Sequence, residues 1–71
     1  MLEQDRKDLE IFSRNEITEH SIYLRLAARE KDAHNRAVLE AIAADEKRHY
    51  ELIKEESGVA ARPDRRRIIW Y

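Results

Sequence analysis

The residues with the clearest potential for chemistry are two glutamates and a histidine. Glu46 and His49 form a Glu-x-x-His pair, and on a helix this spacing places a carboxylate and an imidazole on one face, one turn apart. Glu16 lies in an earlier stretch of helical periodicity and would face this pair at a similar height if the two stretches were antiparallel neighbours. Carboxylate oxygens combined with imidazole suit Fe(II) or Mn(II), and Zn(II) could compete. We therefore predict that Glu16, Glu46 and His49 bind metal, with a metal-free polar network that fixes dimer register as the alternative.

The first element that must position these side chains is a helix from Leu2 to about Lys31. This stretch contains no Gly or Pro, and its apolar residues recur at helical spacing. A capping box at Ser13-x-x-Glu16, which would start the helix later, is the alternative for its N-terminus. Projected at 100° per residue, the centre of the buried stripe holds Leu9, Phe12, Glu16, Tyr23 and Ala27.

A second helix follows a short turn at residues 31–34, with Asp32 as its predicted N-cap and Gly58 as its C-terminal stop. A turn this short makes the two helices antiparallel neighbours. Glu46 and His49 then point into the interior, where an ionised carboxylate is costly unless it is paired or bound to a cation. The predicted stripe of this helix centres on Asn35, Ile42, Glu46 and Ile53, with Val38 and His49 on one flank.

Residues 1–58 are therefore predicted to form one helical hairpin, and residues 59–71 a basic and aromatic tail or linker. The tail either docks on a partner or leads into a longer protein. An isolated hairpin cannot bury apolar stripes on both helices, and the nine Ala contribute little apolar area. We expect an all-α fold in which the antiparallel two-helix hairpin dimerises into a four-helix bundle. Such a pair would supply four Glu and two His, the ligand set of di-iron and di-manganese carboxylate bundles.

Composition excludes several other classes of protein. The chain has no cysteine, so it has neither a disulfide framework nor a thiolate metal site. Its 14 Lys and Arg residues nearly balance its 15 Asp and Glu residues, so the chain as a whole lacks the positive charge that would attract nucleic acid. The chain has only one Gly and one Pro, too few for the turns that β-hairpins require, which excludes an all-β fold. No apolar run approaches the roughly 20 residues of a membrane span, and the N-terminus lacks a signal-peptide core, so we expect a cytoplasmic location.

Two stretches carry a family resemblance. E-I-T-E-H-S-I-Y-L-R-L-A at 16–27 and I-A-A-D-E-K-R-H-Y at 42–50 resemble the first two helices of a rubrerythrin-type member of the ferritin-like superfamily. The longer stretch N-R-A-V-L-E-A-I-A-A-D-E-K-R-H-Y at 35–50, the Gly58 stop and the R-P-D-R tail are most similar to the ferritin-like domain that precedes the membrane part of some proteins related to vacuolar iron transporters. The two-helix size is also similar to that of the encapsulated ferritins, which build a di-iron site across a dimer interface.

The resemblance implies an iron-binding protein with a di-iron site shared across a homodimer or a higher homo-oligomer. Glu16 and Glu46 would be metal ligands, with Glu46 bridging and His49 a terminal ligand, and Tyr23 would lie beside them. The activity would be that of a ferroxidase-like oxidoreductase that oxidises Fe(II) for iron storage, detoxification or transport. The further partner would be either a membrane iron transporter, fused to the chain or associated with it, or an encapsulin shell. The expected locations therefore also include a membrane surface and the inside of a protein shell.

Two further residues flank Glu16 on the first helix. His20, one turn on, is predicted to lie beside the ligands or in solvent, and Glu19 on the other edge to be a rim carboxylate or an extra ligand. The competing function is a metal-free helical-hairpin dimerisation module, and a third is iron binding without turnover, as a sensor or chaperone. All of these functions use the same three residues.

Overall fold

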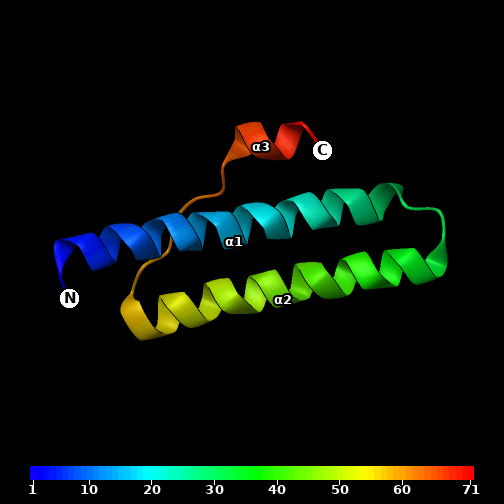
Figure 1. Ribbon diagram of the computed structural model, residues 1–71. Coiled ribbons are helices and arrows are strands. Elements are labelled where there is room, and N and C mark those ends of the chain that lie inside the picture. The colour runs from blue at the N-terminus through cyan, green and yellow to red at the C-terminus, as the bar shows by residue number, and fades with distance from the viewer.

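The structure is a computed structural model that describes residues 1–71. It contains only helices: α1 spans Glu3–Arg29, α2 spans Ala33–Ser57, and the short α3 spans Arg65–Ile69. Helices α1 and α2 lie side by side and run antiparallel, in a molecule that measures 45 × 23 × 12 Å (Figure 1). The predicted helical hairpin is thus confirmed, whereas the pairing of two hairpins stays a prediction. None of the three helices combines the length and the hydropathy that crossing a membrane would require.

The helix ends follow local signals in the sequence. The Asp32 side chain accepts a hydrogen bond from the backbone N–H of Asn35 at 2.8 Å, which confirms Asp32 as the N-cap of α2. Gly58 has a φ of 75°, a left-handed conformation that glycine adopts without strain, and its N–H closes the last turn of α2. Helix α1 begins at Glu3. The later start at a Ser13 capping box is therefore wrong, because Ser13 lies inside a continuous helix.

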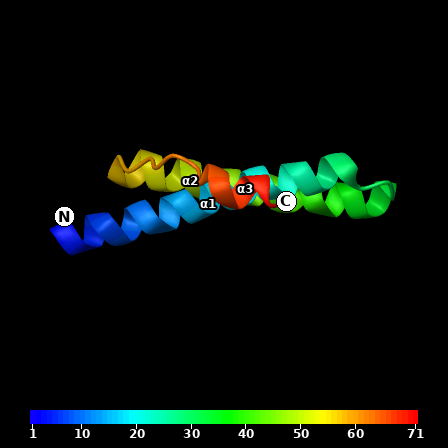
Figure 2. The ribbon, with the colours of Figure 1, turned by 90° about the horizontal axis from the view of Figure 1, so that it is seen from above.

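The tail folds back along α1 instead of extending away from the hairpin. The segment between α2 and α3 crosses α1, so α3 lies on the side of α1 opposite α2 (Figure 1) and over the middle of the hairpin (Figure 2). Val59, at the start of this segment, is only 2% exposed. Two buried hydroxyls of α1 hold the segment: Ser13 Oγ accepts from Ala61 N at 3.1 Å, and Thr18 Oγ1 accepts from Asp64 N at 2.8 Å. The tail is therefore part of the folded unit.

The buried face of α1 differs from the predicted stripe. Glu16 and Ala27 are buried as predicted, but Phe12 is 52% exposed. The difference arises because α1 contacts α2 on one side and α3 on another, so its buried residues spread beyond a single stripe and include Ile17 and Ile22. The edge of α1 that carries Phe12 is left open in the single chain.

Helix α2 is buried less than its pattern predicts. Ala43 is its one fully buried residue, Glu46 is half-buried, and His49 is exposed. The prediction that His49 points into the interior is wrong for the single chain. His49 lies on the flank of the stripe, and one neighbouring helix is too narrow to cover both the centre of the stripe and its flank.

Candidate metal centre

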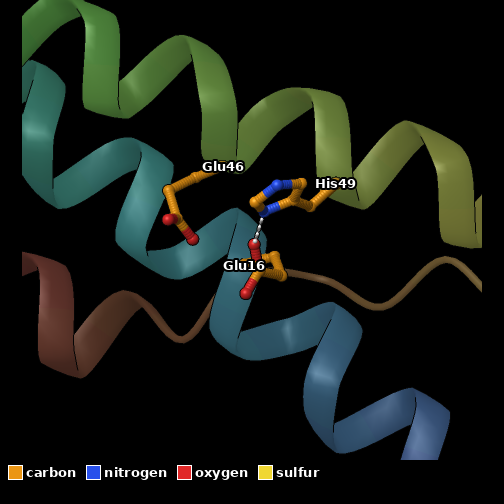
Figure 3. Close-up of side chains that lie close together, drawn as sticks. All are labelled: Glu16, Glu46 and His49. Atoms are coloured by element: carbon orange, nitrogen blue, oxygen red, sulfur yellow. Dashed lines mark hydrogen bonds and ion pairs between the residues drawn. The ribbon is translucent and has the colours of Figure 1, made fainter.

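Glu16 of α1 and the Glu46–His49 pair of α2 converge at one place in the hairpin. The three side chains each offer one ligand atom, and these atoms all lie within 4.8 Å of one another. Figure 3 shows Glu46 and His49 reaching from α2 toward Glu16 on α1. The antiparallel pairing of the helices thus brings together residues that lie 30 or more positions apart in the sequence, as the spacing predicts.

Glu16 and His49 are joined directly. His49 Nδ1 lies 2.9 Å from Glu16 Oε2, and because an ionised carboxylate only accepts hydrogen bonds, the imidazole N–H is the donor. The Glu16 side chain is only 11% exposed, whereas that of His49 is 51% exposed. The buried carboxylate therefore has one partner inside the chain, and the imidazole forms the solvent side of the cluster.

Glu46 is the least satisfied member of the cluster. Its Oε2 atom is buried and has no hydrogen-bond partner. Burial raises the pKa of the Glu46 carboxyl above its ordinary value of 4.5 and contact with Glu16 raises it further, whereas contact with Glu19 and the charge of the nearby His49 lower it. A buried carboxylate oxygen without a partner is costly, and a cation is one of the few groups that can satisfy it.

Glu19 extends the cluster on α1. Burial raises the pKa of its carboxyl, and its contact with Glu46 raises it further, while Arg67 of α3 lowers it. The structure therefore brings Glu19 next to Glu46, where the sequence predicts either a rim carboxylate or an extra ligand. Three carboxylates and one imidazole thus gather in one small region of the hairpin.

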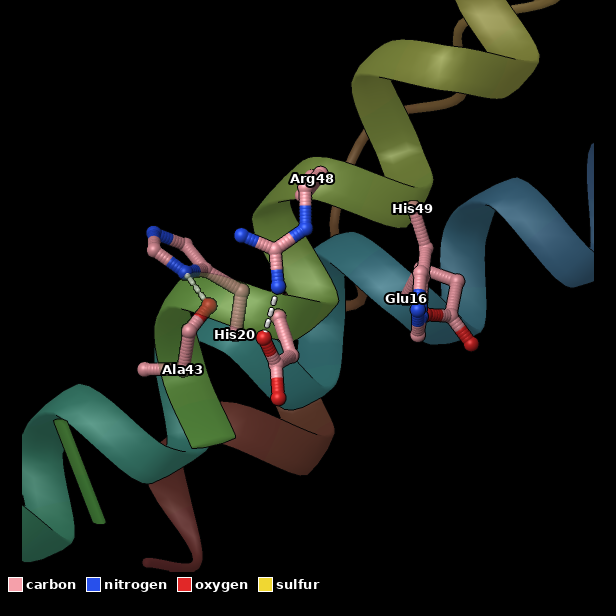
Figure 4. A network of polar contacts seen from close by, with 6 residues as sticks. Glu16, His20, Ala43, Arg48 and His49 are labelled. Carbon is pink, nitrogen blue, oxygen red and sulfur yellow. Dashed lines mark hydrogen bonds and ion pairs between the residues drawn. The ribbon is translucent and has the colours of Figure 1, made fainter. Parts of the chain in front are cut away.

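The other two residues singled out in the sequence lie differently. His20 turns to the backbone of α2: its Nδ1 lies 2.6 Å from the carbonyl oxygen of Ala43, and because a carbonyl only accepts, the ring N–H donates (Figure 4). His20 therefore ties the two helices together and forms no hydrogen bond with Glu16 or His49. Tyr23 is half-buried on α1, and its hydroxyl forms no hydrogen bond with the three ligand residues.

The charges on the outer side of α2 are balanced without the cluster. Arg48, next to His49 in the sequence, forms an ion pair with Asp45 one turn earlier (Figure 4). Lys47 pairs in the same way with Glu51 at 3.4 Å. The two basic residues of the Glu-x-x-His stretch therefore do not neutralise Glu46, which leaves its charge for a proton or a cation.

Sequence reasoning missed the residues that fasten the tail. Ser13 and Thr18 are fully buried, and both use their hydroxyls to accept backbone N–H groups of the tail. Small hydroxyl residues on the core side of a helix could have signalled this, because a buried hydroxyl needs a hydrogen-bond partner.

The arrangement can hold a hard or borderline divalent cation with two carboxylates and one imidazole. Three ligands from one chain leave coordination positions open to solvent or to another chain. No family model matches this chain, and neither a curated protein nor a solved structure matches it. The resemblance to ferritin-like proteins therefore stays a prediction that rests on the residues themselves.

Proposed function

We propose that two copies of this chain pair into a four-helix bundle and bind two Fe ions between them, through Glu16, Glu46 and His49 of each copy. One observation carries the proposal: the ligand atoms of these side chains lie within 4.8 Å of one another. Glu46 Oε2, which is buried with no hydrogen-bond partner, adds to it. A divalent cation would provide that partner and offset the repulsion between the carboxylates.

The donor set supports Fe(II), with Mn(II) as the nearest competitor. Carboxylate oxygens prefer hard cations, and a single imidazole is compatible with first-row metals. Zn(II) could occupy the same ligands in vitro, since affinity alone does not discriminate against it. Metal ligands bind in their deprotonated forms, so protons compete with the cation and binding should weaken as the pH falls.

A second copy is part of the proposal because a single hairpin offers an incomplete site. His49 is half exposed, and Phe12 lies open on the edge of α1. A two-fold-related hairpin over this edge would cover both residues and double the ligand set to four Glu and two His.

The activity that we propose for the loaded dimer is ferroxidase-like. The bound metal pair would supply the redox chemistry, in which Fe(II) becomes Fe(III) and the electrons pass to O₂ or peroxide. The chain's own residues Glu16, Glu46 and His49 would hold the ions, and the two carboxylates would offset part of their charge. The product would serve iron storage, detoxification or delivery to a transporter.

A metal-free dimerisation module is the second candidate, and one observation favours it. The hydrogen bond between His49 Nδ1 and Glu16 Oε2 already satisfies both groups without a metal, as a register-fixing polar pair would require. This function leaves Glu46 Oε2 unexplained, because the His49–Glu16 pair needs no second carboxylate beside it.

Anaerobic Fe(II) titration of the purified protein, followed by mass measurement of the intact complex and then by admission of air, tests the proposal. Two Fe per dimer and a new near-ultraviolet absorption on oxidation would support it. The matched control is Glu55→Gln, which removes a carboxylate from an exposed position of α2, against Glu46→Gln. A well-folded dimer that takes up no stoichiometric Fe would leave the dimerisation module as the function.

A further inference from the structure

The largest hollow of the molecule lies away from the three ligand residues, between α1 and the tail. It is open to solvent, has a volume of about 830 Å³ and has no hydrophobic residue in its lining. This volume falls within the range of pockets that bind small molecules, roughly 300–1,000 Å³. Its lining consists of Arg14, Arg62, Pro63, Asp64, Arg65 and Arg66. We refer to this feature as the arginine hollow.

The fold assembles the arginine hollow from two distant parts of the chain. Arg14 belongs to α1, and the other arginines belong to the tail. The tail is held beside α1 by the hydrogen bonds from Ala61 N to Ser13 Oγ and from Asp64 N to Thr18 Oγ1. Because both hydroxyls are fully buried, these bonds fix where the tail lies relative to Arg14.

The arginine hollow has an excess of positive charge. None of the four arginines in its lining forms an ion pair, although Arg6 and Arg48 elsewhere in the chain do. Asp64 is the one acidic residue of the lining, and its Oδ1 accepts the backbone N–H groups of Arg66 and Arg67. Four arginines and one aspartate therefore line the hollow, which leaves three positive charges in excess, and a bound anion would relieve the repulsion between the arginines.

We propose that the arginine hollow binds a multiply charged anion of the phosphate class, such as a pyrophosphate group. The planar guanidinium donates two parallel N–H groups, which match the oxygens of a phosphate. A phosphate is tetrahedral and offers oxygens in several directions, so arginines on opposite walls can bind one group, whereas a carboxylate offers two oxygens in one plane. The residues that line the hollow are charged except for Pro63, which fits a ligand that is recognised through its charge.

The arginine hollow shares no residue with the candidate metal centre. Arg14 and Glu16 are two residues apart on α1, so their side chains leave the helix about 200° apart and point to different sides. Binding of a phosphate-class anion therefore does not rest on the proposed iron function, and the metal-free protein can be used to test it.

Calorimetric titration of the full chain with pyrophosphate at moderate salt tests the proposal. Arg14→Gln and, on the tail, Arg65→Gln should each weaken binding about tenfold, the effect of losing one charge-assisted contact. Arg25→Gln is the matched control, because Arg25 is an exposed residue of α1 outside the arginine hollow, and it should leave the affinity unchanged. Both test residues are exposed, and circular dichroism melting verifies that their variants fold.

Three results would overturn the proposal. The first is no pyrophosphate binding at about 1 mM, the weak end of specific affinity. The second is an equal loss of affinity in Arg25→Gln, which would show that only the overall charge matters. The third is citrate binding as tight as that of pyrophosphate, which would refute the preference for phosphate.

Cosedimentation with vesicles distinguishes two sources of the phosphate group. Phosphatidylcholine vesicles with added phosphatidic acid present it as a lipid headgroup, and pure phosphatidylcholine vesicles are the blank. Cosedimentation that pyrophosphate competes away and that Arg14→Gln abolishes would support the site with a headgroup as its source. Pyrophosphate binding without cosedimentation would support it with a soluble phosphate.

Discussion

Replacing Glu46 by Gln changes the candidate metal centre by one atom and one charge, and the structure predicts opposite effects with and without metal. In the metal-free chain Glu46 Oε2 is buried and unpaired, and the carboxyl lies beside those of Glu16 and Glu19. An unsatisfied buried acceptor costs about 1–3 kcal/mol, and a glutamine amide could donate to either neighbouring carboxylate. We expect Glu46→Gln to raise the free energy of unfolding by about 1 kcal/mol, which shifts Tm by roughly 4–8 °C in a domain of this size.

The gain should depend on pH in a definite direction. The pKa of Glu46 is raised in the folded state, so the folded chain holds this proton more tightly than the unfolded chain does. The resulting stability is fully present below the ordinary value of 4.5 and is lost as the pH rises through the raised pKa. Glutamine does not titrate, so the stability of Glu46→Gln does not fall in this way. The difference in free energy of unfolding between Glu46→Gln and the wild type should therefore grow as the pH rises from 4.5 toward neutrality.

Metal should reverse the order of stability. A ligand that binds only the folded state at 100 times its Kd adds about 2.7 kcal/mol, or roughly 10–20 °C in Tm for a domain of this size. The wild type should gain this amount with Fe(II) under anaerobic conditions or with Mn(II) in air. Glu46→Gln should gain little, because the amide is a far weaker ligand than the carboxylate.

Thermal unfolding followed by circular dichroism, with and without metal, measures both effects on the same samples. Glu55→Gln is the control, since Glu55 is an exposed residue of α2 and its variant should stay within about 0.5 kcal/mol of the wild type in both states. Equal destabilisation of Glu46→Gln with and without metal would refute the metal site, and the register-fixing network would stand in its place.

Three other substitutions test separate parts of the structure. His49→Ala should weaken Fe(II) or Mn(II) binding at least about tenfold, as measured by anaerobic titration. Phe12→Asp should shift the proposed dimer toward monomer in sedimentation equilibrium, because Phe12 is 52% exposed in the single chain and burying that remaining surface in both copies would stabilise the interface by roughly 1.5–3 kcal/mol. Thr18→Val should destabilise the chain by about 1–2 kcal/mol in thermal unfolding, and amide exchange at Asp64 should speed up, since this N–H loses its acceptor.

Each of these variants has a matched control in the chain. His34→Ala removes an exposed histidine at the start of α2 and should leave the metal affinity as it is. Leu24→Asp introduces the same charge at an exposed residue on another side of α1 and should leave the dimer intact. Thr18→Ser keeps the hydroxyl and should retain most of the stability. Undiminished Fe(II) binding by His49→Ala, or a dimer that survives Phe12→Asp, would contradict the corresponding part of the proposal.

The helices and their ends could be predicted because they depend on residues close together in the sequence. Asp32 caps α2 through a bond to a backbone N–H three residues on, and Gly58 ends it through its own left-handed conformation. The Glu46–His49 pair shares a face because their spacing of three residues is close to one turn. The meeting of this pair with Glu16 also followed, since a short turn fixes the register of two antiparallel helices.

The rotation of each helix about its own axis could not be read from the same pattern. A periodic stripe shows which residues share a face, but the residues that become buried depend on how many neighbours cover the helix. Helix α1 has two, and so Phe12 is exposed whereas Ile17 and Ile22 are buried. The hydrogen bond from His20, one turn after Glu16, to the backbone carbonyl of Ala43 on α2 is likewise set by how the two helices pack.

The sequence by itself determined the helical hairpin, its turn and its caps, and the convergence of two carboxylates and an imidazole, because these features depend on short-range spacing. Only the tertiary structure decided that the tail returns to α1, that Ser13 and Thr18 fasten it, and that Arg14 meets the arginines of the tail. These contacts join residues more than 40 positions apart. No local pattern records them, because they form only where the folded chain brings a buried hydroxyl and a backbone N–H within hydrogen-bond distance.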